Sequence, residues 1–352
     1  MRLIALAGDG IGPEITAATL AVLRAASERF GLDLHIVEDV VGHESLRRHG
    51  TTVRPDLLDA VRKADGFILG PTAAFEYPGE INPSMFFRKS LDLYANIRPA
   101  RTYPGLKSIA GAFDLIVVRE NTEGFYADRN VESGGSEMLI TPDVVVSLRR
   151  ITRQCCERIA RSAFELAQRR QQKVTAVHKA NVLKRGDGLF LEECRKVAKE
   201  FPGVALDEII VDAMMAHVVR NPARFDVIVT TNMFGDILSD LTAELSGSLG
   251  LGGSLNASGR HAMAQTAHGT APDIAGKNVA NPFSLILSAA LLLDWHGRRK
   301  GEAKFATAAS AIEKGIEAAV AAKQATGDIG GTLGTRETGE ALAARLKEWA
   351  AA

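Results

Sequence analysis

Leu3-Ile4-Ala5-Leu6-Ala7-Gly8-Asp9-Gly10-Ile11-Gly12-Pro13-Glu14 combines an apolar run, a glycine-rich turn and the first residues of a helix. The apolar residues 3–7 predict a strand, and the helical spacing of apolar residues from 13 to 30 predicts a helix. The glycines match neither the G-x-G-x-x-G spacing nor a nucleotide-kinase loop, so a structural turn and a phosphate-binding turn remain equally open. A strand that leads through a turn into a helix indicates an α/β protein.

The same alternation continues along the chain. It predicts a mostly parallel sheet with helices on its faces. A glycine-rich segment, residues 247–259, interrupts the second half and is compatible with a crossing between domains. The further strands are expected at residues 34–37, 66–69, 115–119, 174–178, 208–211 and 226–230.

Length and composition exclude several classes of protein. The 352 residues are enough for one large or two medium domains, and 46% hydrophobic with 24% charged residues is ordinary for a globular chain. Lys plus Arg and Asp plus Glu both number 42, which argues against nucleic-acid binding through bulk charge. Apolar runs such as 285–293 fall short of the roughly 20 residues that span a bilayer, so no membrane partner is expected. Three cysteines favour a reducing, cytoplasmic location.

Polar residues stand where three predicted strands end. Lys179 follows the strand at 174–178, Asp212 the strand at 208–211, and Thr231 and Asn232 the strand at 226–230. In open α/β sheets, ligands bind beyond the carboxyl ends of the strands. These residues are therefore candidates for a binding or catalytic site.

Two aspartates four residues apart form the strongest local signal. Asp236 and Asp240 would share one face of a helix, where like charges repel unless a cation lies between them. Carboxylate oxygens suit Mg²⁺ or Mn²⁺, and Asp212 would supply a third ligand. A solvated acidic helix face is the alternative.

Three arginines and one loop add weaker signals. Arg88, Arg98 and Arg119 would bind a di- or tricarboxylate if they converged, because guanidinium groups bind carboxylates in pairs of hydrogen bonds. On the sequence alone, ordinary surface arginines are the better interpretation. The loop at residues 268–277 carries an acid, Asp273, that suits ribose hydroxyls.

Taken together, these segments resemble the isocitrate/3-isopropylmalate dehydrogenase family of metal-dependent β-decarboxylating dehydrogenases. The resemblance extends from the turn at residues 8–14 to residues 278–294 and so covers almost the whole chain. Its most specific segments are Leu91-Asp92-Leu93-Tyr94-Ala95-Asn96-Ile97-Arg98-Pro99, Val118-Arg119-Glu120-Asn121-Thr122-Glu123-Gly124, His178-Lys179-Ala180-Asn181-Val182-Leu183, and residues 232–240 and 268–277.

The resemblance implies a two-domain α/β fold with a mixed sheet through both domains, distinct from the Rossmann fold. Residues 1–98 and 247–352 would form the discontinuous first, NAD-binding domain. Residues 99–246 would form the second, with the dimer contacts and metal ligands. It also implies a homodimer whose active sites are shared between subunits.

The resemblance also assigns roles to residues. Arg88, Arg98 and Arg119 would bind the carboxylates of a malate-type substrate. Asp236 and Asp240 of one subunit and Asp212 of the other would hold Mg²⁺ or Mn²⁺. Lys179 of the partner would help to remove the hydroxyl proton at C2, hydride would pass to the nicotinamide, and Tyr126 would help to protonate the enolate left after loss of CO₂.

The cofactor implied is NAD. NADP-dependent isocitrate enzymes of the family have Lys-Tyr where this chain has Asp273-Ile274, and an aspartate binds ribose hydroxyls but repels a 2′-phosphate. The full set of implied cofactor-binding residues is His268, Gly269, Thr270, Ala271, Asp273, Ile274 and Asn281.

Two departures from the family pattern bear on substrate choice. Gln265 stands where many members have a glutamate, and the specificity segment holds Asn82 and Ser84 six and four residues before Arg88. Isocitrate enzymes of the family have Ser six residues and Asn four residues before the corresponding arginine. Isopropylmalate enzymes have leucines four and three residues before it. The expected substrate is a 3-substituted malate such as isocitrate or 3-isopropylmalate. Homoisocitrate, tartrate or D-malate, or a catalytically silent nucleotide-binding subunit, remain as alternatives.

Overall fold

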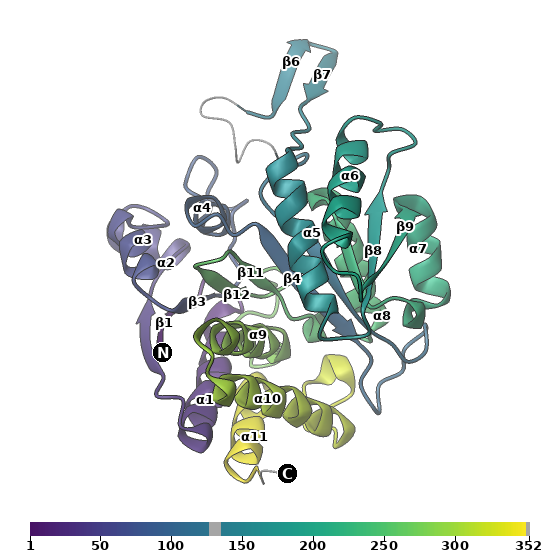
Figure 1. The fold of residues 1–352 in the computed structure, drawn as a ribbon. Helices are drawn as coiled ribbons and strands as arrows, with labels where there is room; N and C mark the ends of the chain where they lie inside the picture. Colours follow the sequence, from purple (N-terminus) through teal and green to yellow (C-terminus); the bar gives the residue numbers. More distant parts are fainter. Residues whose placement is uncertain (127–134, 350–352) are drawn as a thin grey trace. The chain divides into compact units, whose positions relative to one another are not determined.

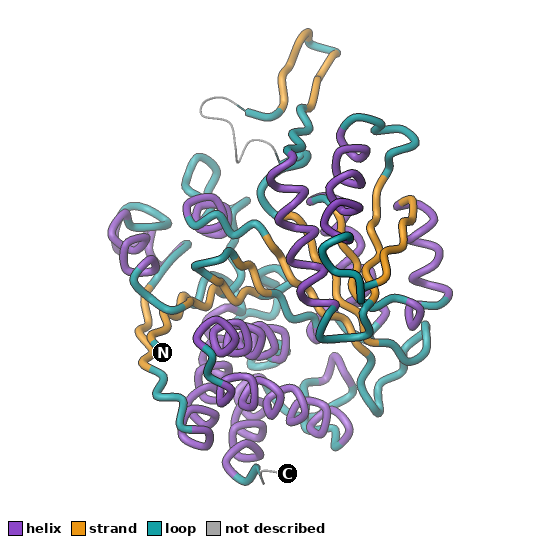
Figure 2. Tube along the Cα trace, in the orientation of Figure 1, coloured by secondary structure: helices purple, strands orange, loops and turns teal. Residues whose placement is uncertain are grey.

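The computed structural model describes residues 1–126 and 135–349 (Figures 1 and 2). The chain divides into two compact units. Unit 1 comprises Met1–Leu91, Tyr103–Lys107 and Gly247–Ala352, and unit 2 comprises Asp92–Thr102 and Ser108–Ser246. Within the described part of the chain, none of the helices has the length and apolar character that a bilayer span requires.

The strands of unit 1 form a mixed arrangement in the order β2-β1-β3-β12-β11. The first four are parallel and β11 is antiparallel to β12. They are β1 (Arg2–Leu6), β2 (His35–Asp39), β3 (Gly66–Leu69), β11 (Leu255–Ala257) and β12 (Ala262–Gln265).

Seven α-helices of unit 1 pack on these strands and on one another. Helix α9 (Phe283–Lys300) contains the apolar run at 285–293 and contacts β12, so the run belongs to a buried core helix. Helix α1 (Gly12–Phe30) packs along α11 (Thr335–Lys347). The others are α2 (His43–His49), α3 (Pro55–Arg62), α4 (Pro83–Ser90) and α10 (Ala303–Ala321), with 3₁₀ turns η3 (Leu249–Leu251) and η4 (Gly327–Ile329).

The main strands of unit 2 follow the order β4-β5-β10-β8-β9. Only β4 is antiparallel to its neighbour; the other pairs are parallel. These strands are β4 (Ala95–Arg101), β5 (Asp114–Glu120), β8 (Lys173–His178), β9 (Ala205–Ile210) and β10 (Val227–Thr230). A separate antiparallel hairpin pairs β6 (Glu137–Thr141) with β7 (Val144–Ser147).

Helices cover both faces of the unit 2 sheet. Successive side chains of a strand point to opposite faces, and β5 follows this rule: Ile116 and Val118 pack with α5 (Arg153–Ala167) and α6 (Gly186–Ala198). Leu115 and Val117 pack with α7 (Val211–Arg220) and α8 (Asn232–Leu245). A short 3₁₀ turn, η2 (Pro222–Arg224), follows α7. The alternation directs Arg119, two residues after Val117, towards the α8 face.

The structure confirms the α/β class with mixed strand directions. Every strand expected from the sequence is present, with ends shifted by up to three residues. One shift bears on the site: the strand before Asp212 ends at Ile210, so Asp212 lies in the first turn of α7 and not directly at a strand end. The domain division expected from the sequence stays a proposal, because packing units do not define functional domains.

Candidate active site

Arg119 is the buried centre of a polar cluster in unit 2. It lies near the end of β5 and is only 2% exposed. Its Nε and Nη2 both donate to Oδ1 of Asn232, at 2.9 and 2.7 Å, and its Nη1 donates to Asp236. Asn232 in turn donates from Nδ2 to the carbonyl of Glu123 at 3.0 Å. The first residue of α8 therefore fixes the orientation of the guanidinium.

Arg98, from the middle of β4, reaches the same helix one turn further along. Its Nη1 donates to Ser239 Oγ at 2.7 Å and to Asp240 Oδ1 at 3.0 Å, and lies 3.4 Å from Asp236 Oδ1. The structure thus brings Arg98 and Arg119 together on Asp236, as convergence of the arginines requires. Two guanidinium groups and two carboxylates leave this cluster with no net charge.

Asp236 and Asp240 share one face of α8, as their spacing predicts. Burial raises the pKa of Asp240, the nearby Arg98 opposes that rise, and the carboxylate of Asp236 adds to it. Both side chains remain partly accessible, at 33% and 54%. Residues 1–126 and 135–349 contain no group of three or more His, Cys, Asp and Glu side chains placed to hold a metal ion. Asp212 therefore does not join the pair within one chain.

Tyr126 lies on the other side of Asp236. Its hydroxyl donates to Oδ2 of Asp236 at 3.2 Å, and the Arg119 guanidinium lies 5.7 Å from the centre of its ring. Tyr126 follows a loop that begins at Glu120, so the placement of its hydroxyl depends on how that loop is held.

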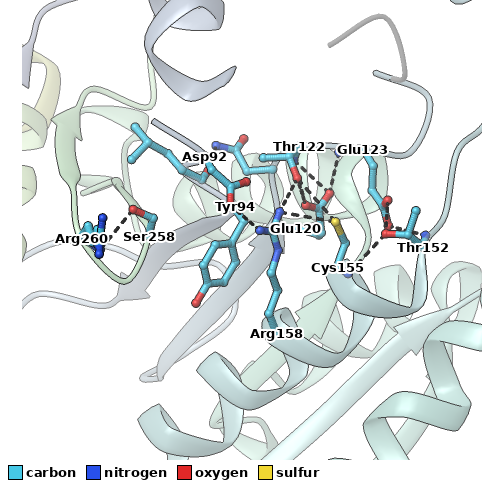
Figure 3. Close-up of polar contacts among 12 residues, drawn as sticks. Asp92, Tyr94, Glu120, Thr122, Glu123, Thr152, Cys155, Arg158, Ser258 and Arg260 are labelled. Carbon is cyan, nitrogen blue, oxygen red and sulfur yellow. Dashed lines mark hydrogen bonds and ion pairs between the residues drawn. The ribbon is translucent and has the colours of Figure 1, made fainter. Parts of the chain in front are cut away.

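The buried carboxylate of Glu120 holds the first part of this loop (Figure 3). It accepts hydrogen bonds from the Thr122 amide and hydroxyl and from the Glu123 amide, at 2.5–3.0 Å. Burial raises the pKa of Glu120. Arg158 of α5 donates to the Thr122 hydroxyl at 3.0 Å and to Asp92 at 2.6 Å. The turn is thereby tied to both β5 and α5.

Glu123 ties the second part of the loop to the start of α5. Its carboxylate accepts from the amide and the hydroxyl of Thr152, both at 2.9 Å. Thr152 is itself the N-cap of α5, where its hydroxyl accepts from the Cys155 amide. The loop between Arg119 and Tyr126 is therefore anchored at both ends by buried carboxylates.

Lys179 and Asp212 form a second polar pair in unit 2. Lys179 follows β8, and its Nζ lies 2.5 Å from Asp212 Oδ1. This hydrogen bond lowers the pKa of the Asp212 carboxyl. The Lys179 amide donates to the buried Asp187, which pairs with Arg149 at 2.6 Å. The backbone that carries Lys179 is therefore fixed, and its amine lies next to an exposed carboxylate.

Arg88 belongs to unit 1, where it lies beside Ser84 and Gln265. Arg88 Nη2 donates to Gln265 Oε1 at 2.8 Å, and the Ser84 hydroxyl lies 3.1–3.2 Å from both ends of the Gln265 amide. Asn82 is the N-cap of α4 and accepts from the Met85 amide at 3.2 Å. In the specificity segment Asn82 therefore caps α4, and Ser84 and Arg88 share Gln265 as a hydrogen-bond partner; substrate contacts of Asn82 and Ser84 stay predictions.

The loop at 268–277 packs against the glycine-rich turn of unit 1. The Ile11 amide donates to the Thr270 carbonyl at 2.9 Å, and a Cβ at Gly10 would lie 2.1 Å from that oxygen. Gly10 also has a φ of +57°, so packing and conformation both require glycine there. Burial lowers the pKa of His268. Gly269 and Asp273 of the same loop are exposed.

The remaining cofactor candidates differ in what they already contact. Ala271 has a positive φ of 39°, and Ile274 closes a turn by donating to its carbonyl at 3.1 Å. Asn281 is buried, donates to Asp328 at 3.0 Å and accepts from the Phe283 amide at 2.9 Å. Its amide helps to begin α9, and a cofactor contact for it stays a prediction.

The chain matches the family model described as isocitrate/isopropylmalate dehydrogenase over residues 2–342. It is 40% identical over 352 residues to the 3-isopropylmalate/3-methylmalate dehydrogenase of Methanocaldococcus jannaschii, covering 99% of each chain. It is 40% identical over 349 residues to the isocitrate/homoisocitrate dehydrogenase of Thermus thermophilus, covering 98% of each. The structure of isocitrate dehydrogenase from Methylococcus capsulatus superposes with a TM-score of 0.88 at 37% identity, covering 98% of this chain and 99% of that one.

The chain belongs to the isocitrate/isopropylmalate dehydrogenase family. It is therefore an oxidoreductase of the β-decarboxylating dehydrogenase type, and relatives at about 40% identity oxidatively decarboxylate isopropylmalate- or isocitrate-type hydroxy acids. The family typically uses NAD or NADP with a divalent metal. The resemblance, fold class and enzyme class expected from the sequence are confirmed.

Sequence reasoning missed the residues that orient the arginines. Asn232 binds Arg119 and Ser239 binds Arg98, yet the sequence analysis names Asn232 only for its position after a strand and does not name Ser239. The signal was available, since Asn232, Asp236, Ser239 and Asp240 follow the i, i+4, i+7, i+8 spacing of one helix face. Gly235 gave no such signal, because its role depends on the neighbouring strand.

Gly235 allows Arg119 to lie against α8. A Cβ at this position would lie 2.7 Å from Cβ and Cγ of Arg119. We expect Gly235→Ala to lower the free energy of unfolding by about 1 kcal/mol, because an overpacking cost of about 1–3 kcal/mol exceeds the helix-propensity gain of about 1 kcal/mol. Urea unfolding measures the change. The matched control is Gly188→Ala in α6, where a Cβ meets open space and stability should rise by up to about 1 kcal/mol. Equal effects at the two glycines would contradict the packing argument.

Proposed function

We propose that this protein oxidises and decarboxylates a 3-substituted malate, with NAD as hydride acceptor and Mg²⁺ or Mn²⁺ as metal. The observation that carries the proposal is the contact of Asp236 with Arg98, Arg119 and Tyr126. It combines groups that bind carboxylates, a carboxylate suited to a divalent cation and a hydroxyl able to move a proton. A surface salt-bridge cluster would not need a buried arginine oriented by a buried asparagine.

Substrate carboxylates would bind to Arg98 and Arg119, with Arg88 as a third candidate. Both unit 2 arginines are at least nine-tenths buried, and guanidinium groups in such surroundings form strong charge-assisted hydrogen bonds. Their partners include the carboxylates of Asp236 and Asp240. A substrate anion on the arginines together with a cation on the aspartates would keep the local charge balanced.

The carboxylates of Asp236 and Asp240 fit a hard divalent cation. They offer oxygen ligands one helical turn apart and remain partly exposed. Asp212 of a second copy would supply the third carboxylate, since it does not join the pair within one chain. When bound, the metal would act as a Lewis acid on the C2 oxygen.

Proton transfers fall to Lys179 and Tyr126. Lys179 of a second copy, as its neutral amine, would receive the C2 hydroxyl proton directly or through water and become an ammonium. Tyr126 would deliver a proton to the enolate carbon after CO₂ has left. Its hydroxyl is held by Asp236 on a loop anchored by two buried carboxylates, which limits its movement.

NAD would bind along the loop at 268–277 in unit 1. Asp273 is exposed, so its carboxylate can accept hydrogen bonds from the ribose hydroxyls of NAD. A 2′-phosphate at the same place would meet a like charge. Ile274 adds no cation to offset that repulsion.

The exposed apolar β6–β7 hairpin of unit 2 supports a homodimer, because apolar surface in water is unfavourable in free energy. The β6–β7 hairpin extends away from the sheet of unit 2 (Figure 1), and every residue of both strands is exposed. An isolated two-stranded hairpin is marginally stable in water, and exposed apolar strands are normally covered. A second copy of the chain is the partner we propose. The exposed apolar side chains of the hairpin are Met138, Leu139, Ile140, Val144, Val145 and Val146.

A cytoplasmic location completes the proposal. All three cysteines are free and buried, and burial raises the pKa of Cys155, Cys156 and Cys194. Unreactive free thiols are typical of a reducing compartment.

A substrate panel tests the proposed reaction. With NAD⁺ and Mn²⁺, at least one of isocitrate, 3-isopropylmalate, homoisocitrate, D-malate and tartrate should yield NADH and CO₂. EDTA should abolish turnover, because the proposed mechanism needs the metal as a Lewis acid on the C2 oxygen, and added Mg²⁺ or Mn²⁺ should restore it. Turnover of none of the five would favour a silent nucleotide-binding subunit, and full activity in excess chelator would contradict the metal assignment.

Cofactor preference tests the role of Asp273. NAD⁺ should be preferred to NADP⁺ by about a hundredfold in kcat/KM, or about 2.7 kcal/mol at 1.4 kcal/mol per tenfold. Asp273→Lys combined with Ile274→Tyr should shrink or invert that preference. Equal use of both cofactors by the natural protein would rule out this reading of the loop.

Sharing of the site between subunits has its own test. Tyr126→Phe and Lys179→Ala dimers should each be impaired at both sites, whereas a mixed dimer has one site with both changes and one with neither. Refolding the two variants together gives mixed dimers in about half of the population, so about a quarter of the natural activity should return. If verified mixed dimers show only the average activity of the parents, the two residues act within one chain.

A further inference from the structure

Asp187 is a buried carboxylate that holds the backbone of Lys179. It lies in the first turn of α6, eight positions after Lys179, and is 0% exposed. Its Oδ2 accepts a hydrogen bond from the Lys179 amide. The Lys179 carbonyl accepts from the amides of Val182 and Leu183, at 3.0 and 2.8 Å. Both backbone polar groups of Lys179 are therefore paired, which fixes the direction in which its side chain leaves the chain.

Arg149 supplies the opposite charge that this buried carboxylate needs. Its Nη2 donates to Asp187 Oδ1 at 2.6 Å and to the Thr231 hydroxyl at 3.2 Å, and its side chain is only 11% exposed. Burying a charge is costly in free energy unless the charge is paired and hydrogen-bonded. Each member of the pair therefore makes the burial of the other possible.

The Arg149 guanidinium is itself held from several sides. Its carbon lies 5.6 Å from the centre of the Phe125 ring and 5.7 Å from the centre of the Phe234 ring, within the range of cation–π attraction. A Cβ at Gly186 would lie 2.9 Å from Arg149 Nη1, so α6 begins directly against the guanidinium. The group that binds Asp187 is therefore fixed in position.

Arg149 also joins Asp187 to the segment that carries Tyr126. Phe125, whose ring faces the guanidinium, directly precedes Tyr126 in the chain. The next residue after Arg149, Arg150, forms an antiparallel bridge with Gly124, in which each amide donates to the other carbonyl, at 2.8 and 3.0 Å. All of these contacts lie within unit 2. The buried pair thus connects the two groups to which the proposed function gives the proton transfers.

We infer that Asp187 is a positioning residue for Lys179, and that Arg149 holds Asp187 in place for this role. The inference rests on the proposed function, in which Lys179 receives the C2 hydroxyl proton in the active site of a second copy. Asp187 acts through the Lys179 backbone and not by contact with the substrate. Its effect is therefore expected in the partner's site, and not in the site that contains Tyr126 of its own chain.

Asp187→Asn tests this role, because asparagine keeps the size of the side chain and loses the charge that pairs with Arg149. With NAD⁺, Mn²⁺ and the best substrate of the five-acid panel, kcat should fall by about tenfold to a hundredfold, the loss expected when a reacting group is displaced by about 1 Å. KM for NAD⁺ should stay close to its natural value, because the loop proposed for NAD lies in unit 1. An unchanged kcat would overturn the inference.

Asp226 provides a matched control in the same unit. It is 1% exposed, and it accepts from Arg170 Nε at 2.7 Å and from the Gln171 amide at 2.9 Å, so it too joins an arginine to a backbone amide. Asp226 precedes β10 whereas Lys179 follows the parallel β8, so the two lie at opposite ends of the sheet. Asp226→Asn should lower the melting temperature, as Asp187→Asn does, but leave kcat per folded protein unchanged. Equal losses of kcat in the two variants would overturn the inference.

Arg149→Lys provides the test if Asp187→Asn does not fold. Lysine keeps the positive charge but lacks the planar group that lies between the rings of Phe125 and Phe234. The variant should fold, and its kcat should fall severalfold while KM for NAD⁺ stays unchanged. A natural kcat in Arg149→Lys would contradict the role of the pair.

Mixed dimers locate the effect in one of the two sites. When Tyr126→Phe and Lys179→Ala chains are refolded together, the intact site of each mixed dimer takes Lys179 from the Tyr126→Phe chain. Adding Asp187→Asn to that chain should remove most of the recovered activity, whereas adding it to the Lys179→Ala chain should remove less. Equal losses would overturn the inference. If verified mixed dimers recover no activity before Asp187 is changed, the shared site of the proposed function fails instead.

Discussion

The burial of the Arg119 guanidinium constrains the rest of unit 2. A buried charge that loses its partner typically costs about 3–5 kcal/mol, so this side chain must be matched by acceptors on the neighbouring helix. Asn232 and Asp236 supply them, and Gly235 between them leaves room for the aliphatic part of the side chain. The start of α8 is thereby fixed relative to the end of β5. The position of the loop from Glu120 to Tyr126 then follows, because it begins at the residue after Arg119 and its Glu123 carbonyl accepts a hydrogen bond from Asn232.

The sequence predicted most of what depends on local pattern. Alternating apolar strands and amphipathic helices gave the α/β class, and the four-residue spacing gave the shared face of Asp236 and Asp240. It did not predict β4, whose core-facing residues are interrupted by Arg98 and Pro99, so that no apolar run marks it. The start of α7 was also misplaced, because the β-branched Val211 before Asp212 favours a strand when read alone.

Local sequence patterns could not predict contacts between segments that are distant in the chain. Nothing in the local sequence says that Asn232 meets Arg119, that Gly235 faces the base of that side chain, or that Gln265 meets Ser84. The resemblance to a family flagged Gln265 only as an unusual residue. Its physical meaning needs the two partners that helix α4 brings to it, and relatives of similar identity with different substrates show why overall similarity does not choose among them.

The exposed hairpin has a consequence for the protein in solution. Val144, Val145 and Val146 together with the facing strand form a short, strongly β-prone edge whose one charged residue is Glu137, and such low-charge apolar strands template intermolecular sheets. A protomer left alone at low concentration would present that edge to any other extended chain. In the proposed homodimer, assembly would protect against misassociation as well as complete the proposed catalytic centre, and solubility and stability would then depend on protein concentration by mass action.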